Sequence, residues 1–535
     1  MMQHKPVFEF DACAALPLLA WVARINSSNQ AIVRHGTGVE IAGRFFAEAI
    51  WTGDFAKGEL LQSDCLFGSG GEILPDGIGF ASSIAITDWL FETIRHGVVF
   101  VANSLPLLLA VAGDRLDPRF AGYAAINESV VDGILDYADT LPTEHGVVRR
   151  HVHRNLLVSD GVVTIQAKNL PPSFTGYQAY RDLISNAAAA LAENARSPSR
   201  RHPLAIFSTQ SKGYDSTCCN ALMAPHGIQA VFTVSQGRGS GGYSDRDAAD
   251  QTDDDGTDIA HALGLEVIAV DRRVFEAGIE NELFYWAGME RNRDFNFVGI
   301  HAALRACLPA GSPAVLMGGV FGEIWYPSDV QTARFSHPFK SGHIEDDTLK
   351  QRDVAHCGLS EVRLAVGYIQ ASLPFAGARR RPDIVAISNA SEMQPWRCVP
   401  GYDRPIARRI AEEAGVPRRF FGQIKRASAV EFPPPDVPRG AELRRSFDRF
   451  LRDNRLASGI FIRLLPVVHR FNSFAEHVSP RTNLLGYYAT RVWCALRGAN
   501  EKLPQLGRRL DGAIFCFAVN ELVRRHGEIS KHVAP

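Results

Sequence analysis

The chain has 535 residues, 46% of them hydrophobic, and this length exceeds what one hydrophobic core usually supports, so we expect two or three domains. Its formal net charge of −1 provides no overall field that would attract nucleic acid or an anionic membrane surface. Nine scattered cysteines without a Cys-x-x-Cys pair, and the absence of a long apolar run, predict a cytoplasmic protein with reduced thiols and with neither nucleic-acid nor membrane partners.

Residues 1–175 are predicted to form a β-rich domain. Short apolar runs separated by Gly, Asp and Pro are typical of strands joined by turns. The runs Asn155–Val158 and Val162–Ala167 flank Ser159-Asp160-Gly161, which predicts a β-hairpin with a glycine-containing turn. A helix is predicted over Tyr177–Ala195, at the start of the next domain.

Residues 176–435 alternate between strand and helix signals. Such alternation predicts parallel strands joined by crossover helices, which is the doubly wound sheet of the α/β class. We expect strands at Leu204–Phe207, Gln229–Val234, Glu266–Val270 and Ala314–Met317, and helices beginning at Tyr214, Asp255 and Phe295.

Helical signals dominate after Gly358, and residues 436–535 are predicted to form a helical C-terminal extension. The clearest predicted helices are Glu361–Ser372, Pro405–Ala414, Glu442–Arg452 and Leu510–Arg525.

A polar turn follows the predicted strand Leu204–Phe207 and reads Ser211-Lys212-Gly213-Tyr214-Asp215-Ser216 before an apolar helix begins. A turn between a buried strand and a helix N-terminus exposes backbone N–H groups and the positive end of the helix dipole, which suits an anionic pyrophosphate. The alternative interpretation is an ordinary strand-to-helix turn in which Ser or Asp caps the helix.

This turn resembles the S-G-G-x-D-S motif of PP-loop ATP pyrophosphatases, with Lys212 in place of one glycine. Further segments follow in an order similar to that of the asparagine synthetase family, from Pro203 to Ala427. They are Asp253-Asp254-Asp255 through Leu265, Val315 through Trp325, Ser391 through Trp396, Tyr402-Asp403-Arg404-Pro405, and Gly415-Val416-Pro417 leading to Lys425. The resemblance implies a PP-loop synthetase domain preceded by a degenerate glutaminase-like sandwich of the Ntn type.

The resemblance also implies roles for individual residues. ATP would be bound by Ser211, Lys212, Gly213, Asp215 and Ser216, and Asp215 would hold Mg²⁺. Lys425, Glu323 and Glu392 occupy the places of catalytic residues. Only nine of the 57 basic residues are lysine, so lysines at positions 212 and 425 favour a specific role over a solvated surface charge, which remains the alternative for Lys425.

The sequence departs from the family pattern at the N-terminal nucleophile and at two acidic positions of the synthetase domain. It begins Met1-Met2-Gln3 where glutamine-hydrolysing relatives have an N-terminal cysteine nucleophile, so we expect no glutamine hydrolysis. Two acidic positions of the family fall at Gly319 and Gly322, which makes aspartate a poor candidate substrate. Glu323 then either takes over metal binding or caps the next helix.

The implied function is an ATP-dependent ligase or cyclase that adenylates a substrate carboxylate, releases pyrophosphate and forms an amide bond, as β-lactam synthetases and lasso-peptide cyclases do. We expect a small-molecule or peptide carboxylate as the partner, with a homodimer as a candidate assembly. Two alternatives stay open: a catalytically inactive PP-loop binding module, and a PP-loop adenylase that acts on RNA or a sulfur acceptor.

Overall fold

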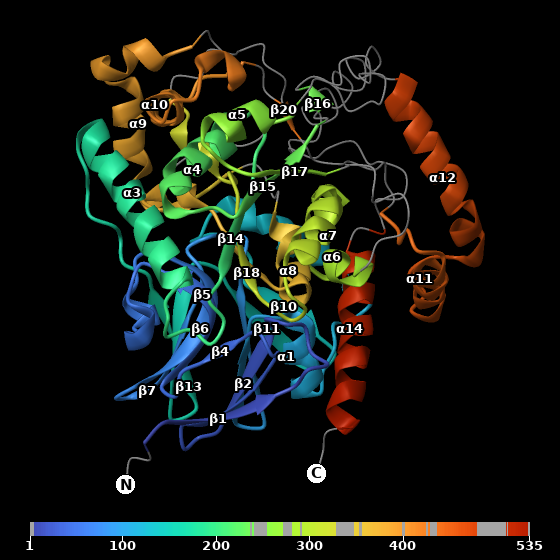
Figure 1. Ribbon diagram of the computed structural model, residues 1–535. Helices are drawn as coiled ribbons and strands as arrows, with labels where there is room; N and C mark the ends of the chain where they lie inside the picture. Colours follow the sequence, from blue (N-terminus) through green and yellow to red (C-terminus); the bar gives the residue numbers. More distant parts are fainter. Residues whose placement is uncertain are drawn as a thin grey trace.

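The computed structural model describes residues 5–235, 238–239, 254–270, 281–288, 292–327, 347–351, 356–398, 402–423, 426–427, 436–478, 510 and 512–532. It shows a mixed α/β protein with a β-rich N-terminal region and a parallel sheet beyond it (Figure 1). The strands of the N-terminal region fill the lower half of this view, and the parallel sheet with its helices lies above them. Lys425 lies outside the described residues.

Two sheets form the N-terminal region. The first has seven strands in the order β1-β3-β2-β9-β8-β11-β10, and the second has six in the order β13-β12-β7-β6-β5-β4. The strands of the first sheet are β1 (Val7–Ala12), β2 (Trp21–Ile25), β3 (Gln30–His35), β8 (Leu90–Arg95), β9 (Val98–Ala102), β10 (Thr140–Thr143) and β11 (Gly146–His151). Those of the second are β4 (Glu40–Ile41), β5 (Phe45–Trp51), β6 (Leu66–Leu74), β7 (Gly77–Ala81), β12 (Arg154–Ser159) and β13 (Val162–Ala167).

The two sheets pack face to face through alternate apolar residues. Trp21 of the first sheet lies 4.9 Å from Phe46 and 5.8 Å from Phe80 of the second, measured between ring centroids. A buried cluster around these rings draws on both sheets. Because side chains alternate between the faces of a strand, one apolar face of each sheet suffices to build this core.

The predicted hairpin in this region is confirmed. β12 and β13 pair antiparallel from Arg154–Ala167 to Ser159–Val162. The turn residues Asp160 and Gly161 both have positive φ, at 52° and 79°. This backbone conformation explains why the turn carries aspartate and glycine.

All four predicted strands of the second region are confirmed, and a fifth joins them. They form one parallel sheet in the order β17-β15-β14-β18-β19. Its strands are β14 (Ala205–Thr209), β15 (Ala230–Val234), β17 (Val267–Val270), β18 (Ala314–Met317) and β19 (Tyr368–Ala371). A short antiparallel pair, β16 (Arg238–Gly239) with β20 (Arg426–Ala427), lies apart from it.

The predicted helix Glu361–Ser372 is wrong. The structure has a short helix, α8 (Val362–Val366), followed by the strand β19. Gly367 ends the helix with a φ of 91°, and the buried run from Tyr368 to Ala371 pairs with β18. A short apolar run suits a helix and a buried strand equally well, and here the open edge of the sheet decides between them.

Helices cover the sheets and form the C-terminal part of the chain. The predicted helices at Tyr177, Tyr214, Pro405, Glu442 and Leu510 appear with boundaries shifted by a few residues. The α-helices other than α8 are α1 (Leu105–Ala112), α2 (Tyr123–Glu128), α3 (Gly176–Ala195), α4 (Tyr214–Met223), α5 (Thr257–Ala262), α6 (Glu282–Gly288), α7 (Val298–Cys307), α9 (Arg381–Asn389), α10 (Pro405–Glu413), α11 (Ala441–Asp453), α12 (Gly459–Val478) and α14 (Ala513–His532).

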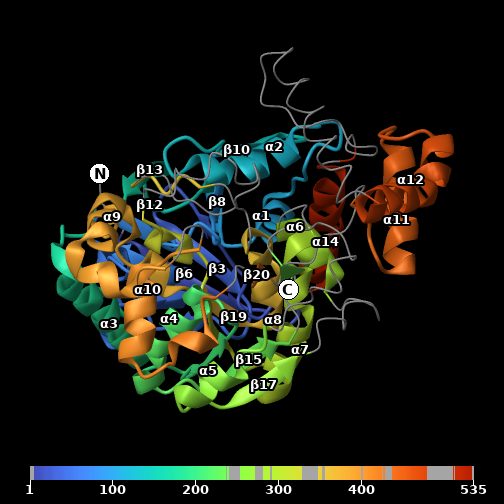
Figure 2. The ribbon, with the colours of Figure 1, turned by 90° about the horizontal axis from the view of Figure 1, so that it is seen from above.

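The C-terminal helices occupy two different places. Seen from the front and from above, α11 and α12 project from one side of the molecule (Figures 1 and 2). In contrast, α14 packs against α1 of the N-terminal region, where Asn520 exchanges two hydrogen bonds with the backbone of Leu116 at 2.9 and 3.0 Å. None of the helices that the structure describes is long and apolar enough to cross a bilayer.

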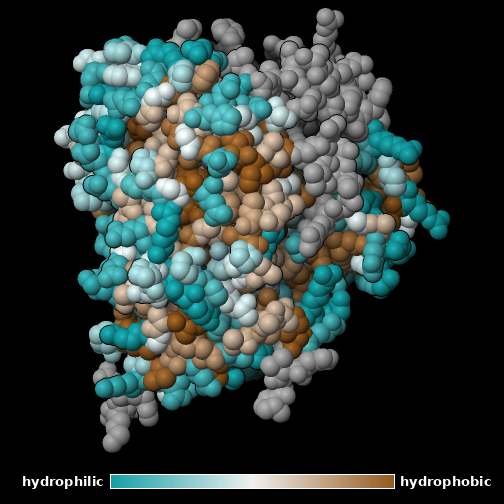
Figure 3. Space-filling model, viewed as in Figure 1, coloured by the Kyte–Doolittle hydropathy of each residue, from teal (hydrophilic) through white to brown (hydrophobic). Residues whose placement is uncertain are grey.

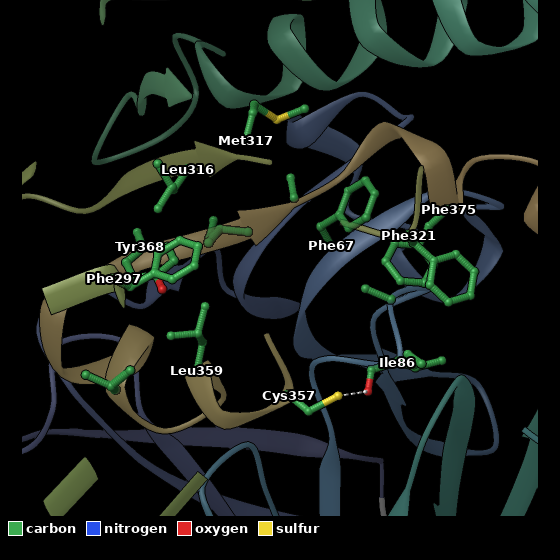
Figure 4. Packing of buried hydrophobic residues seen from close by; sticks show 14 of the residues in the cluster. Phe67, Ile86, Phe297, Leu316, Met317, Phe321, Cys357, Leu359, Tyr368 and Phe375 are labelled. Atoms are coloured by element: carbon green, nitrogen blue, oxygen red, sulfur yellow. Dashed lines mark hydrogen bonds between the residues drawn. The ribbon is translucent and has the colours of Figure 1, made fainter. Parts of the chain in front are cut away.

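One large buried cluster connects the two regions. It extends from the N-terminal strands through the parallel sheet to α14. Figure 4 shows part of it, where Phe67 and Ile86 of the N-terminal region lie close to the ends of β18 and β19. The ring of Phe321 stacks on that of Phe375 at 4.2 Å, and the thiol of Cys357 points to the carbonyl of Ile86. On the outer surface, apolar side chains gather around the edge strand β17, in the middle of the face shown in Figure 3.

Candidate functional site

The order of strands in the parallel sheet reverses at β14. The chain passes from β14 to β15 and β17 on one side, and later adds β18 and β19 on the other side. At such a switch point the connections leave the carboxyl ends of neighbouring strands in opposite directions, and ligands bind in the crevice between them. The turns that follow β14 and β18 therefore border the place where this fold favours a ligand.

Three successive backbone amides in the turn after β14 donate to oxygen atoms. The N–H of Ser211 donates to Oγ of Ser216 at 3.1 Å, that of Lys212 to Oδ1 of Asp254 at 3.0 Å, and that of Gly213 to Oγ of Ser211 at 3.2 Å. Gly213 is also the residue that precedes α4. Each of these amides is engaged by an oxygen of the protein, so a phosphate bound beside this helix N-terminus would take the place of those acceptors.

Buried side chains beneath the turn fix its shape. The side-chain nitrogen Nε2 of Gln210 donates to the carbonyl of Ser211 at 2.6 Å and to Oγ1 of Thr217 at 3.1 Å. The hydroxyl of Thr217 in turn donates to the carbonyl of Gly213 at 2.7 Å, and Asn220 donates to Oε1 of Gln210 at 2.7 Å. A network of this kind holds the three amides in place before a ligand arrives.

The carboxylates of Asp215 and Glu323 share one buried arginine. The guanidinium of Arg404 contacts Oδ1 of Asp215 through one terminal nitrogen and lies 3.1 Å from Oε1 of Glu323 through the other. Asp215 belongs to the first turn of α4, Glu323 to the 3₁₀-helix Gly322–Trp325 after β18, and Arg404 directly precedes α10. The ion pairs thus join three segments at the switch point.

Two glycines bring the turn after β18 into close contact with α4. A Cβ on Gly322 would lie 2.2 Å from Oδ1 of Asp215, and a Cβ on Gly319 would lie 2.5 Å from the backbone nitrogen of Ser216. Real Cβ atoms do not approach other atoms so closely. Larger residues at these two positions would therefore displace Asp215 or the start of α4.

A second buried arginine lies one turn further along α10. Arg408 donates to the hydroxyl of Tyr214 and lies 4.9 Å from the centroid of its ring. Burial raises the pKa of the Tyr214 hydroxyl above its usual value. Arg408 also lies 3.6 Å from Glu412, so this cation has a counter-ion of its own.

A pocket of about 160 Å³ lies beside the turn, at Lys212. It is lined by Lys212, Asp258, Arg419, Phe420, Phe421 and Gln423. Two cationic side chains and two aromatic rings suit a phosphate group and a flat base, although the volume is smaller than the roughly 300–1,000 Å³ of pockets that enclose a whole organic ligand. A separate cavity at the ends of β18 and β19, beside Phe297 and Tyr368 in Figure 4, measures about 10 Å³, which is room for one water molecule.

The structure brings most of the predicted site residues together and places Glu392 elsewhere. Ser211, Lys212, Gly213, Asp215 and Ser216 form the turn and the first residues of α4, and Glu323 joins Asp215 through Arg404. Glu392 makes its contacts on another face of α10: its carboxylate, 47% exposed, lies 3.1 Å from Arg409 and accepts a 3.4 Å hydrogen bond from the amide of Tyr177. Lys425 lies outside the described residues, so its predicted catalytic role stays a prediction.

Asp215, the predicted magnesium ligand, is paired with the guanidinium of Arg404. Within the described part of the chain, no group of three or more His, Cys, Asp or Glu side chains is placed to hold a metal ion. The two carboxylates nearest the turn, Asp215 and Glu323, both contact a guanidinium. A divalent cation on Asp215 would therefore lie against a fixed positive charge, and the donor set as it stands does not fit Mg²⁺.

Sequence reasoning missed Arg404, Arg408 and Asp254. Arg404 stands directly before Pro405, and a proline at the first turn of a helix predicts that the preceding side chain lies at a helix start. The abundance of arginine in this chain, however, gives no reason to single out one of them. Asp254 was part of a predicted acidic helix start, but only the fold shows that its carboxylate reaches the amide of Lys212.

Comparison with protein-family models found no match to this chain, and comparison with curated proteins found none either.

Proposed function

We propose that the chain binds ATP at the turn between β14 and α4 and uses it to adenylate a carboxylate, as an AMP-forming ligase or cyclase related to the asparagine synthetase family. The observation that carries the proposal is the position of this turn. It leads into α4 at the switch point of a parallel sheet, where phosphate-bearing ligands bind in folds of this kind. The resemblance of the sequence from Pro203 to Ala427 supports the same assignment.

The proposal also assigns each of the two regions of the fold to a domain type. The parallel sheet with the turn after its central strand corresponds to a doubly wound PP-loop synthetase domain. The two face-to-face sheets of the N-terminal region correspond to a degenerate glutaminase-like sandwich. The domain limits 1–175, 176–435 and 436–535 stay predictions, and α14 of the third segment packs on the first.

The chemistry would proceed in two displacements. A carboxylate oxygen of the substrate attacks the α-phosphorus of ATP, and the bond from that phosphorus to the bridging oxygen breaks, releasing pyrophosphate. An amine nitrogen then attacks the acyl carbon, AMP leaves, and the nitrogen loses its proton as the amide forms. The turn amides and Lys212 would hold the phosphates, and Lys425 would stabilise the charge that develops on the α-phosphate.

A nucleotide-binding titration and a pyrophosphate-release assay test this proposal. We expect the full chain to bind a fluorescent ATP analogue, and Ser216→Ala to weaken binding about tenfold, which is roughly the worth of one lost hydrogen bond to a charged group. Ser159→Ala, in the β12–β13 hairpin, is the matched control and should bind as the parent does. A screen of carboxylic acids for pyrophosphate release then identifies the substrate. A chain that does not bind the analogue contradicts the proposal.

One observation favours the second candidate, a binding module without chemistry. The carboxylate of Asp215 is enclosed between Gly322 and Arg404, so a group expected to assist catalysis is engaged within the protein. This candidate predicts nucleotide binding without pyrophosphate release from any acid in the screen. The two functions are thus separated by the second assay and not by the first.

A further inference from the structure

Arg404 is a fully enclosed cation beside the candidate site. Its side chain is 0% exposed, whereas those of its partners Asp215 and Glu323 are each 19% exposed. Its guanidinium carbon lies 4.4 Å from the ring centroid of Tyr326 and 5.7 Å from that of Tyr402. The two rings and the two carboxylates fix the guanidinium in one position.

The guanidinium of Arg404 is surrounded by negative charge, as a bound metal cation would be. Two carboxylates from different segments converge on it, as they would on a divalent metal ion. Burial lowers the pKa of Arg404 to about 9, so the side chain remains protonated at neutral pH. The single positive charge of Arg404 balances one of the two carboxylate charges, and its two terminal nitrogens satisfy one oxygen of each.

The packing around Asp215 leaves no second place for an ion on the side of Arg404. The backbone of Gly322 lies so close to Asp215 that a single added carbon would collide with Oδ1, Cγ and Cβ of the aspartate. The carboxylate is thus held between the turn after β18 and the guanidinium. Both neighbours would have to move before a metal could reach Oδ1.

We infer that Arg404 is the resident cation of this site: it pairs with both Asp215 and Glu323 and occupies the place that a divalent ion bound by these two carboxylates would need. The inference replaces the predicted contact between Asp215 and Mg²⁺ and makes Arg404 a positioning residue for the turn. It stands on the ion-pair geometry alone, so it holds whether or not the chain binds ATP.

Binding of Mn²⁺ to the nucleotide-free full chain tests the inference, with free Mn²⁺ followed by electron paramagnetic resonance. Replacing the guanidinium in Arg404→Met leaves two carboxylates facing one another, so we expect a new Mn²⁺ site with at least tenfold higher affinity than any in the parent. Adding Asp215→Asn to that variant should remove the new site. Arg408→Met is the matched control, because it removes an equally buried arginine, four residues further along the chain, without freeing these carboxylates, and should gain no site.

The variant Asp215→Asn in the parent background decides the question even if Arg404→Met does not fold. If Arg404 is the resident cation, this nearly isosteric change leaves the Mn²⁺ titration unchanged. A parent chain that binds Mn²⁺ and loses at least tenfold in affinity on Asp215→Asn overturns the inference. So does a folded Arg404→Met variant, judged by circular dichroism, that gains no Mn²⁺ site.

Discussion

Asp215 lies where three segments of the chain meet, and two glycines set the distance between them. Gly319 and Gly322 let the backbone after β18 approach α4 more closely than any residue with a side chain would permit. Arg404 closes the other side of the same carboxylate. The geometry of the candidate site therefore depends on small residues that themselves carry no chemistry.

Replacing Gly322 by alanine should displace the carboxylate of Asp215. The added carbon would lie 2.2 Å from Oδ1 and 2.3 Å from Cγ, so we expect a loss of about 1–3 kcal/mol in the free energy of unfolding, typical of an overpacked site. Gly318→Ala is the matched control from the same turn, since its nearest neighbouring atom would lie 4.0 Å away. Urea unfolding measures both variants, and Asp215→Ala should relieve part of the loss in Gly322→Ala because it removes Oδ1 and Cγ but keeps Cβ, which would lie 2.6 Å from the added carbon.

Lys425→Arg should slow the chemical step while ATP still binds. A compact ammonium reaches a phosphoryl oxygen where a planar guanidinium does not fit, and this chain otherwise relies on arginine for its cations. If the lysine acts only in the transition state, kcat should fall by the equivalent of roughly 2–4 kcal/mol with little change in the dissociation constant of ATP. The exposed Lys57→Arg serves as the control, and an unchanged kcat in Lys425→Arg would return Lys425 to a solvated surface charge.

The candidate site was predictable from the sequence only where its residues are consecutive. Ser211 to Ser216 stand in one polar run between a strand and a helix, and the structure places them at the switch point. Arg404 and Asp254 reach the same turn from segments that are nearly 200 and about 40 residues away. Which arginine or aspartate makes such a contact is decided by tertiary packing, about which local patterns carry no information.

At the scale of elements, strands and helices were predictable where the apolar pattern was long or bounded by turn residues. The four central strands and the helix α3 follow from such patterns. The segment 361–372 shows the limit, because Gly367 divides it into a helical turn and a strand whose existence depends on the free edge of β18. The helix α1 shows another: Ser104 caps it locally, but its N-terminus is also bonded by Glu361 from 257 residues away.

The contact between Glu361 and α1 should make stability depend on pH. The carboxyl group lies 2.8 Å from both the hydroxyl of Ser104 and the backbone nitrogen of Leu105, and burial raises its pKa from 4.5 to about 7 despite these donors. The folded protein therefore binds this proton more tightly than the unfolded chain between pH 4.5 and 7, so the contribution to the free energy of unfolding is full below pH 4.5 and falls as pH rises to 7. The loss is on the order of 3 kcal/mol across that window.

Urea unfolding of the parent and Glu361→Gln at several pH values measures this contribution. The stability of the parent relative to the variant should fall between pH 4.5 and 7 and stay level above pH 7. Ser104→Ala removes a donor that favours the charged carboxylate, so it should raise the pKa of Glu361 further and extend the fall to higher pH. A relative stability that rises with pH over this window would contradict the assignment.

At the scale of the whole molecule, a buried ion-pair cluster links the N-terminal sheets to the region of the parallel sheet. Arg363 of α8 lies 2.8 Å from Glu48 of β5 and also contacts Asp88, and all three side chains are buried. Ser69 and Asn103 donate further hydrogen bonds to Glu48 at 2.6 and 3.2 Å. Together with the shared apolar cluster, this contact predicts that both regions unfold in one cooperative transition.

Breaking the cluster from one side should cost more than removing it entirely. Arg363→Met leaves two unpaired carboxylates in the interior, for which we expect a loss of roughly 3–5 kcal/mol in the free energy of unfolding. The triple variant Arg363→Met, Glu48→Gln, Asp88→Asn removes the stranded charges and should recover part of that loss. Tryptophan fluorescence reports on both regions, through Trp21 and Trp89 in one and Trp286 and Trp325 in the other, and should coincide with circular dichroism in the parent. A triple variant less stable than Arg363→Met would mean that the hydrogen bonds to Glu48, and not its charge, hold the two regions together.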